Sequence, residues 1–306
     1  MHIVITGGAG FIGSNLTESL CRSNEITVID NLHSGNKANL TKSFLNDVKF
    51  HHCSCMNIGS LDLDEVDLIF HLGMPSSSPM YKASPYLVGD AISSTLGVFE
   101  YARDHDVGRV VYASSSSLYN GLPSPQNEQM PVEVTDYYTE ARLCVERIAR
   151  LYTVLHGVKS VGLRFFSVYG PHEEYKGKYA NIVTQFLWDM QKGIQPVIYG
   201  DGNQRRDFIY VNDIVKAFKT FSFSNTTCDI FNVGTGVSYS FNNVVDILNE
   251  KLKTDIVPKY IEMPMKNYVS ITQSDTTKAD SKEYTPDYTL ESGIDELIKY
   301  YNKIKV

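Results

Sequence analysis

Three glycines near the start of the chain limit the folds open to it more than any other feature. A short apolar run is followed by Gly7, Gly10 and Gly13, a helical stretch, and a second apolar run that ends at Asp30. This order corresponds to strand, glycine-rich turn, helix, strand and acid within one βαβ unit. In such a unit the first glycine permits a tight turn, the second lets backbone N–H groups approach a ligand, and the third lets the helix pack closely on the strand. The pattern predicts a Rossmann-type unit.

The same unit predicts its ligand. The helix that begins after Gly10 presents unpaired backbone N–H groups and the positive end of its dipole, which favour a pyrophosphate. The Asp30 carboxylate can accept hydrogen bonds from both hydroxyls of an adenosine ribose and would repel a 2′-phosphate. We therefore expect NAD rather than NADP. In the alternative, the glycines serve packing only, but the agreement of four features in order and spacing favours the cofactor.

Apolar runs alternate with amphipathic stretches through the first half of the chain. Further strands are predicted at residues 48–52, 67–71, 108–113 and 160–165, and long helices at about 86–105 and 137–156. Continuous apolar strands separated by helices are typical of a parallel sheet covered on both faces, with ligands bound beyond the carboxyl ends of the strands. The loops expected to form the site follow Ile5, Asp30, His71, Ala113 and Phe165.

The character of the sequence changes after Pro171, where a loop-rich segment begins. A helix is predicted at 211–221, a strand that rejoins the sheet at 229–233, and a closing helix at 291–304. We expect an α/β fold, a Rossmann-type doubly wound parallel sheet with a smaller C-terminal α/β substrate domain. The predicted NAD-binding domain comprises residues 1–168 with 208–235, and the predicted substrate domain comprises 169–207 with 236–306.

Size and charge exclude several classes of function. The chain has 306 residues, enough for a sizeable core, and its net charge of −7 argues against a nucleic-acid partner. An anionic ligand would then need a local cluster of arginine or lysine. No apolar run is long enough to cross a membrane, and the chain opens directly into the first strand without the charged region of a leader. We expect no membrane partner and a cytoplasmic location.

The five cysteines show no paired spacing. Cys53 and Cys55 lie beside His51 and His52 at a predicted strand end, so a metal site must be weighed. Adjacent histidines on a strand point to opposite faces, and no second ligand pair follows at a zinc-binding spacing. We expect no metal, and reduced, partly buried thiols.

A serine cluster and a tyrosine carry the expected chemistry. Four serines follow the predicted strand 108–113, and Tyr138 lies one helical turn before Arg142 on the same face of the next helix. A fixed cation favours the ionised form of a neighbouring phenol. Such a phenolate can take a proton from a sugar hydroxyl while a hydride leaves the same carbon, and Ser115 can hydrogen-bond that oxygen. In the alternative, the serines only cap a helix and Tyr138 and Arg142 form a surface pair.

Short motifs spread over most of the chain agree with one family. They are residues 6–13, 30–32, 70–72, 163–166, 168–171, 199–202, 206–208 and 231–234, together with Ser115 and Tyr138. In these motifs the chain resembles the extended short-chain dehydrogenase/reductases, in the NAD-dependent epimerase/dehydratase group typified by UDP-glucose 4-epimerase. The resemblance is specific for the superfamily rather than for one reaction.

The resemblance implies a reaction cycle. The catalytic tyrosine takes the proton of the sugar 4-hydroxyl while NAD takes the C4 hydride, the 4-keto sugar turns in the site, and the hydride returns to the other face. By residue match, Tyr138 is the base, Ser115 is its partner, and Arg142 stands where the family has a lysine. Arg206 would hold the nucleotide diphosphate and Tyr199 would flank the nucleotide base. The implied function is that of a UDP-glucose 4-epimerase-like enzyme acting on a nucleotide sugar, a UDP-hexose.

The residue match also predicts two sets of binding residues and a dimer. The cofactor set is Gly7, Ala9, Gly10, Phe11, Ile12, Gly13, Asp30, Asn31, Leu32, Ser34, Leu72, Gly73, Ala113, Ser114, Tyr138, Arg142, Phe165 and Val168. The substrate set is Ser115, Ser116, Ser167, Asn181, Tyr199 and Arg206. In the implied homodimer, helices 86–105 and 137–156 pair with their mates as a four-helix bundle.

Several positions depart from the family pattern. Arg142 keeps the charge of the family lysine and can reach ribose hydroxyls, but it is bulkier and cannot pass on a proton. The other departures are Ser54 for an Asp or Asn, residues 71–75 for a run of alanines, Ser167 for an Asn, and the lack of an arginine near Ser270, for which Lys266 could compensate. Most of these positions surround the substrate, so the sugar need not be the glucose/galactose pair.

Three other functions stay open. A dehydratase of the same superfamily needs an Asp–Glu pair after the catalytic serine or threonine, and Ser116 and Ser117 stand there instead. Ordinary hydroxyls cannot serve as the required acid, which disfavours dehydration. A UDP-glucuronate decarboxylase would share the 4-keto intermediate. A catalytically weak NAD-binding or regulatory protein would explain Arg142 and Ser167 as signs of lost activity.

Overall fold

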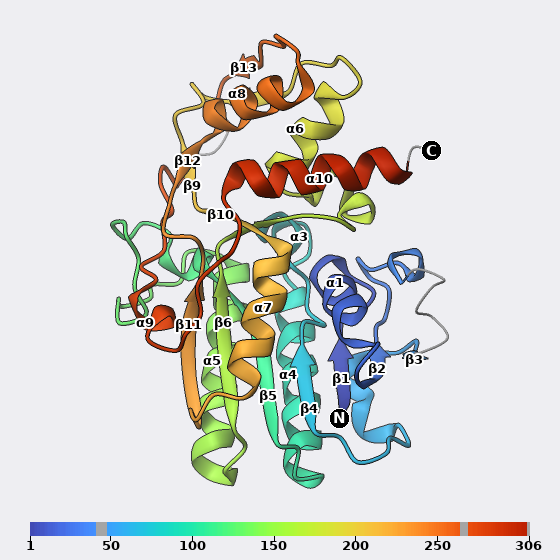
Figure 1. The fold of residues 1–306 in the computed structure, drawn as a ribbon. Coiled ribbons are helices and arrows are strands. Elements are labelled where there is room, and N and C mark those ends of the chain that lie inside the picture. The colour runs from blue at the N-terminus through green and yellow to red at the C-terminus, as the bar shows by residue number, and fades with distance from the viewer. Residues whose placement is uncertain (41–47, 264–268, 305–306) are drawn as a thin grey trace.

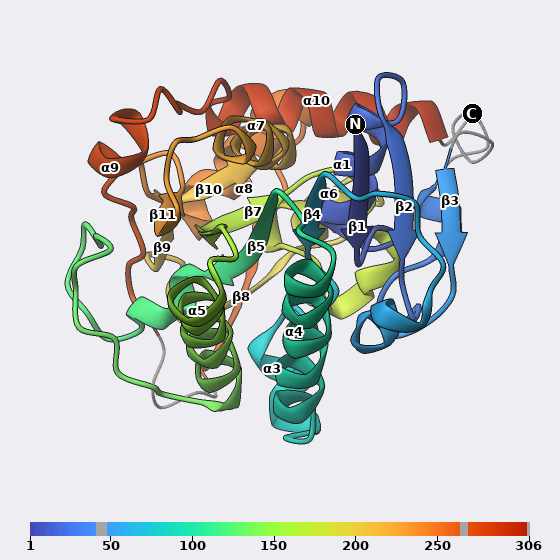
Figure 2. The same cartoon turned by 90° about the horizontal axis from the view of Figure 1, so that it is seen from below.

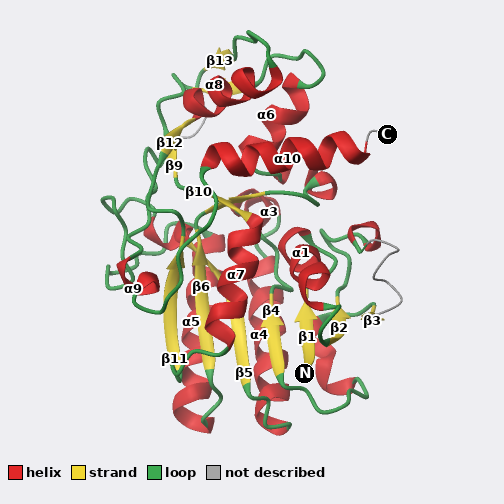
Figure 3. Cartoon of the chain, viewed as in Figure 1, coloured by secondary structure: helices red, strands yellow, loops and turns green. Residues whose placement is uncertain are grey.

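A seven-stranded parallel sheet forms the centre of the protein (Figures 1 and 3). The computed structural model describes residues 1–40, 48–263 and 269–304. The strand order is β11-β6-β5-β4-β1-β2-β3, and every neighbouring pair is parallel. The strands are β1 (His2–Thr6), β2 (Glu25–Ile29), β3 (Val48–His51), β4 (Leu68–His71), β5 (Arg109–Ser115), β6 (Ser160–Phe165) and β11 (Cys228–Val233). The predicted Rossmann-type, doubly wound α/β fold is confirmed.

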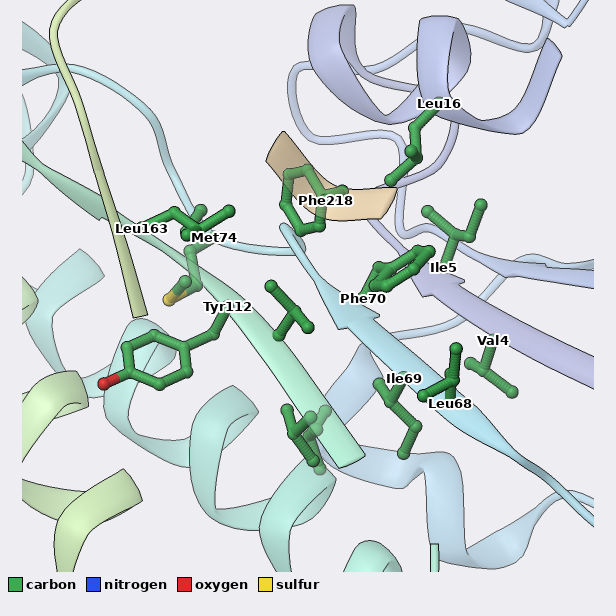
Figure 4. Close-up of a cluster of buried hydrophobic side chains, with 14 of the residues drawn as sticks. Val4, Ile5, Leu16, Leu68, Ile69, Phe70, Met74, Tyr112, Leu163 and Phe218 are labelled. Carbon is green, nitrogen blue, oxygen red and sulfur yellow. The ribbon is translucent and has the colours of Figure 1, made fainter. Parts of the chain in front are cut away.

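Helices cover both faces of this sheet, as its continuous apolar strands require. Figure 2 shows α4 (Leu87–Asp104) and α5 (Tyr137–His156) side by side on one face, and α1 (Phe11–Leu20) and α7 (Val211–Ser222) on the other. Side chains of the central strands fill the space between the layers (Figure 4). Phe70 of β4, for example, meets Phe218 of α7 edge to face, with ring centroids 5.1 Å apart.

A second apolar cluster lies beyond the carboxyl ends of the strands, in the upper part of Figure 1. Its helices are α6 (Ile182–Met190), α8 (Phe241–Leu252) and α10 (Leu290–Ile304). Small two-stranded sheets accompany them: β7 (Ser167–Tyr169) with β10 (Phe208–Tyr210), β9 (Arg205–Arg206) with β12 (Tyr239–Ser240), and β8 (Val197–Tyr199) with β13 (Lys259–Ile261). The sequence predicted the helices at 211–221 and 291–304, and it predicted short strands in this part of the chain without their positions. The domain boundaries stay a prediction.

Short helices complete the chain. They are η1 (Lys37–Asn39), η2 (Cys55–Ser60), α3 (Ser78–Ala83), η3 (Ser116–Tyr119), η4 (Glu174–Tyr179) and α9 (Thr277–Asp280). Across the described ranges, no helix is long and apolar enough to cross a membrane. The cytoplasmic location stays a prediction.

One buried histidine should make the stability of the fold depend on pH. His71 ends β4 without exposed surface, and its ring contacts Thr6 Oγ1 at 2.8 Å and Thr95 Oγ1 at 3.3 Å. Burial lowers the pKa of His71 to about 3, against 6.5 for an unperturbed ring. Between these two values the unfolded state binds more protons than the folded state, so stability falls as the pH falls.

We expect the free energy of unfolding to drop by about 2 kcal/mol between pH 6.5 and pH 5 on account of this ring. Urea titrations at several pH values measure the slope. His172, whose pKa burial lowers to about 4, adds to the same slope and stays in place in a His71→Gln variant. That variant should therefore show a shallower slope than the parent but not a flat one, and equal slopes would count against the assignment.

Candidate active site

A cleft of about 1520 Å³ opens at the carboxyl ends of the central strands. Its lining comes from the loops after β1, β2, β4, β5 and β6, which are the loops that the sequence indicates. Segments near Lys176, Asn181 and Arg206 contribute further lining residues. The cavity exceeds the roughly 300–1,000 Å³ of an ordinary small-molecule pocket, which leaves room for two ligands together.

Most of the predicted binding residues line this cleft, and three do not. Ala9 and Leu32 are outside the lining, but their backbone N–H groups donate to the Asp30 carboxylate at 2.9 and 2.7 Å and so help to position it. Tyr199 lies on β8 with 44% of its surface exposed, outside the cleft lining. Lys266 lies outside the described residues. The individual binding roles stay predictions.

The glycine turn has the geometry that a closely approaching pyrophosphate requires. Gly7 has φ +70, and a Cβ built there would lie 2.7 Å from the Leu72 backbone. A Cβ at Gly13 would lie 2.1 Å from Gly7 O, so only glycine lets α1 pack on the turn. Gly10, the N-cap of α1, offers no side chain to the first helical N–H groups. Those groups are left to a ligand, which fits a dinucleotide pyrophosphate.

Asp30 is the residue predicted to bind the adenosine ribose of such a cofactor. Its side chain lines the cleft, and its two oxygens accept the N–H groups of Ala9 and Leu32. Each carboxylate oxygen keeps a further lone pair, so the group can still accept hydrogen bonds from two ribose hydroxyls. Burial raises the pKa of Asp30, although the backbone donors oppose this. These residues fit NAD.

We expect the chain to bind NAD at least about 100-fold more tightly than NADP, because a 2′-phosphate would face the Asp30 carboxylate. Calorimetric titration with both dinucleotides measures the ratio. Asp30→Asn removes the repelling charge and should shrink the ratio, whereas Asp62→Asn, at an exposed position, should leave it unchanged. Equal affinities in the parent would remove Asp30 from this role.

Tyr138 is held at the edge of the cleft by the start of α5. Asp136 and Thr139 form a capping box, in which each side chain accepts a hydrogen bond from the other residue's backbone N–H. The Tyr138 ring is 7% exposed and packs against Tyr81, with centroids 5.4 Å apart. The guanidinium of Arg142 lies 5.1 Å from the same ring. The pair is therefore buried, and the alternative of a surface pair is wrong.

The Arg142 guanidinium is anchored to backbone oxygens around the cleft. Its nitrogens donate to Pro75 O at 2.7 Å and Ala113 O at 3.3 Å, and one of them also contacts Met74 Sδ at 3.3 Å. Its Nε is buried and has no hydrogen-bond partner within the described structure. Arg142 thus joins α5 to the loop after β4 and to the end of β5, a role that the sequence did not reveal.

The serine cluster serves two purposes. Ser115 caps η3 by accepting the Ser117 N–H at 3.1 Å, as the capping alternative predicts, and its hydroxyl still lines the cleft as a donor. Ser114 donates to Glu146 Oε1 at 2.6 Å. Glu146 in turn forms a buried ion pair with Arg164 at 2.7 Å, so a satisfied polar network fixes the end of β5 against α5.

Three of the predicted substrate residues, Ser167, Asn181 and Arg206, line the cleft from β7, the start of α6 and β9. Asn181 caps α6 through its side-chain oxygen and donates to Ser167 Oγ at 3.2 Å and Val168 O at 2.9 Å. Arg206, on β9, donates to its neighbour's carbonyl and lies 5.7 Å from the Phe241 ring. Ser54 caps η2 and also lines the cleft.

The cysteine and histidine residues form no ligand cluster in the part of the chain that the structure describes. All five cysteines are described and none is in a disulfide. Burial raises the pKa of the Cys55 thiol to about 11, and the thiol contacts Gly73 O.

Sheet, glycine turn and buried tyrosine together define a dinucleotide-binding enzyme of the extended short-chain dehydrogenase/reductase type. The model of the NAD dependent epimerase/dehydratase family matches residues 3–234, and the chain belongs to this family. NAD is therefore its cofactor. When bound, it would be held by the glycine turn, Asp30 and the residues around Tyr138.

Individual relatives agree with this placement. A putative UDP-glucose 4-epimerase of Methanocaldococcus jannaschii is 31% identical, over 97% of each chain. A UDP-N-acetylglucosamine 4-epimerase of Methanobrevibacter ruminantium, solved with UDP-N-acetylmuramic acid, superposes with a TM-score of 0.93 at 29% identity, over 99% of this chain and 98% of that one. A UDP-glucose 4-epimerase of Thermus thermophilus in complex with NAD gives 0.87 at 25% identity, over 99% of each.

Proposed function

We propose that the chain is a nucleotide-sugar 4-epimerase that acts on UDP-hexoses by transient oxidation at C4. The observation that carries the proposal is the buried arrangement of Tyr138, Arg142 and Ser115 at the cleft, beside the glycine turn. The names of the relatives support it, since they include epimerases of UDP-glucose and of UDP-N-acetylglucosamine.

In this proposal each residue has one task. Tyr138 takes the proton of the sugar 4-hydroxyl and returns it at the end of the cycle, and Ser115 donates a hydrogen bond to the same oxygen. Bound NAD supplies reversible hydride acceptance at C4. Arg142 keeps a positive charge beside the phenol, and Arg206 holds the diphosphate in the part of the cleft that Asn181 also lines. The intermediate 4-keto sugar turns within the cleft before reduction.

The residues after Ser115 argue against elimination of water. Ser116 and Ser117 begin η3, and Ser117 uses its backbone N–H for the Ser115 cap. Neither supplies the carboxyl group that a dehydratase needs as an acid.

Product analysis by NMR tests the proposal. The purified chain is incubated with UDP-glucose, UDP-galactose, and their uronate and N-acetyl analogues. The expected product is the 4-epimer of one of these pairs. A pentose formed from the uronate would indicate decarboxylation, and a 4-keto-6-deoxy sugar would indicate dehydration. Bound NAD without turnover of any sugar would favour the regulatory alternative.

We also propose that the enzyme is a homodimer built on α4 and α5. Apolar side chains on these neighbouring helices remain exposed in the single chain, among them Leu96 at 39%, Leu151 at 54% and Leu155 at 67%. Exposed apolar groups gathered on one face favour a protein interface.

Sedimentation at micromolar concentration should therefore give the mass of a dimer. Leu96→Glu combined with Leu151→Glu should give a folded monomer, because both side chains are exposed in the single chain. Its Tm should be lower than that of the parent only by the stabilisation that association provides. A monomeric parent would exclude this dimer.

A further inference from the structure

The cleft must bind anions although the chain as a whole is acidic. NAD carries a pyrophosphate, and the net charge of the chain is −7, so local cations have to provide attraction. Within the described lining, the lysines and arginines are Lys82, Arg142, Lys176 and Arg206. Arg142 is committed to the oxygens of Pro75 and Ala113. Arg206 lies on β9, in the wall assigned to the substrate.

Lys176 is the cation of this group that meets the glycine turn. Its Nζ lies 4.9 Å from the centre of the Phe11 ring. Phe11 is the first residue of α1, and its neighbours Gly10 and Ile12 also line the cleft. The ammonium group therefore lies over the side chain of the residue that begins α1, the helix whose first N–H groups suit a pyrophosphate.

The buried carboxylate of Glu173 holds the Lys176 ammonium group in position through an ion pair. Glu173 has no exposed surface, and its Oε1 accepts Lys176 Nζ at 3.1 Å and the Asn181 N–H at 2.8 Å. Its Oε2 accepts the Thr184 hydroxyl at 2.5 Å. Neutral donors bind both oxygens of Glu173. The carboxylate therefore keeps hydrogen bonds when the Lys176 ammonium group also binds a ligand.

The Lys176 ammonium group can donate further hydrogen bonds. An ammonium group has three N–H bonds. Within the part of the chain that the structure describes, Lys176 donates one of them, to Glu173. The Lys176 side chain is 18% exposed, which leaves it open to the cleft. We propose that Lys176 is a binding residue for the pyrophosphate of the cofactor.

This inference rests on NAD as the cofactor of the family and not on the 4-epimerase reaction. Its test is a binding measurement on the full chain freed of bound nucleotide, by calorimetric titration with ADP, adenosine and UDP. Lys176→Met should weaken ADP binding about tenfold, the effect of one partly exposed charge-assisted hydrogen bond. Adenosine, which has no phosphate, and UDP should bind as in the parent. Lys176→Arg should retain ADP affinity within about threefold.

Lys178→Met is the matched control. Lys178 lies two residues along the same segment, is exposed, and is not one of the cleft-lining residues. Its Nζ lies 5.2 Å from the ring of Tyr179, which does line the cleft. Its removal changes the net charge equally but should leave ADP affinity unchanged. A tenfold loss in this variant would mean that ADP responds to overall charge, which would overturn the proposal.

Loss of Lys176 alone leaves the Glu173 carboxylate buried without a counter-ion and could damage the fold. The pair Glu173→Gln with Lys176→Met removes both charges. The glutamine oxygen still accepts the Asn181 N–H, and its NH2 group can donate to the Thr184 hydroxyl, which then accepts. This pair should show the same tenfold loss for ADP and a Tm close to that of the parent. The proposal fails if ADP affinity is unchanged, if adenosine weakens equally, or if UDP weakens while ADP does not.

Discussion

Tyr138→Phe is expected to lower the rate of epimerisation by about 10³-fold while leaving NAD bound. The proposal gives the Tyr138 phenol one task, the transfer of a proton to and from the sugar 4-hydroxyl, and the variant removes only that oxygen. The ring itself contributes packing against Tyr81 and lies beside the Arg142 guanidinium, and phenylalanine keeps both contacts. The loss should therefore appear in kcat and not in the Tm.

The neighbouring residue offers a matched control. Tyr137 begins α5 directly before Tyr138 but is 52% exposed and lies outside the cleft lining described. Tyr137→Phe should retain full activity. Both variants are assayed with the nucleotide sugar that the parent turns over, and NAD content is read from absorbance after gel filtration. If Tyr138→Phe kept most of its activity, the base would have to be another group and the proposed cycle would fail.

The cofactor half of the site could be predicted from sequence because its determinants are local. Gly7, Gly10 and Gly13 act through backbone geometry within one turn, and the structure shows the close approaches that exclude any Cβ at Gly7 and Gly13. Asp30 follows at the end of the next strand, so its position depends only on the βαβ unit. Continuous apolar strands likewise determined the layers of the sheet.

The remainder of the site depends on contacts between residues far apart in sequence. No local pattern indicates that Arg142 meets Pro75, that Glu146 pairs with Arg164, or that Lys176 reaches the Phe11 ring. The sequence contains one partial indication that Glu146 is buried and needs a partner. It lies one turn after Arg142, on the same buried face of α5. The role predicted for Tyr199 stays a prediction, since its motif matches the family while the residue is not among those that line the cleft.

The role of Arg142 distinguishes two interpretations of the site: an active site in which arginine replaces the family lysine, and a site that has lost its activity. The guanidinium donates to Pro75 O and Ala113 O, and it lies 5.1 Å from the Tyr138 ring. At 4% exposure these contacts give Arg142 a structural role in either case, so the reaction rate has to separate the two. For an adapted site we expect Arg142→Met to lower the rate about 100-fold or more, because it removes the charge beside the phenol and the guanidinium hydrogen bonds to Pro75 O and Ala113 O.

Arg142→Lys separates charge from shape. Lysine keeps a cation at the position but has no planar fork with which to hold both carbonyls, so one of the two contacts is lost. We expect activity within about tenfold of the parent and a Tm lower by a few degrees, in contrast to the large loss in Arg142→Met. Steady-state rates and thermal unfolding of the three proteins, each with its NAD content measured, provide the comparison. A nearly inactive parent that gains about 100-fold in rate from Arg142→Lys would show the opposite, that the arginine is a defect and that the chain has moved towards a binding role.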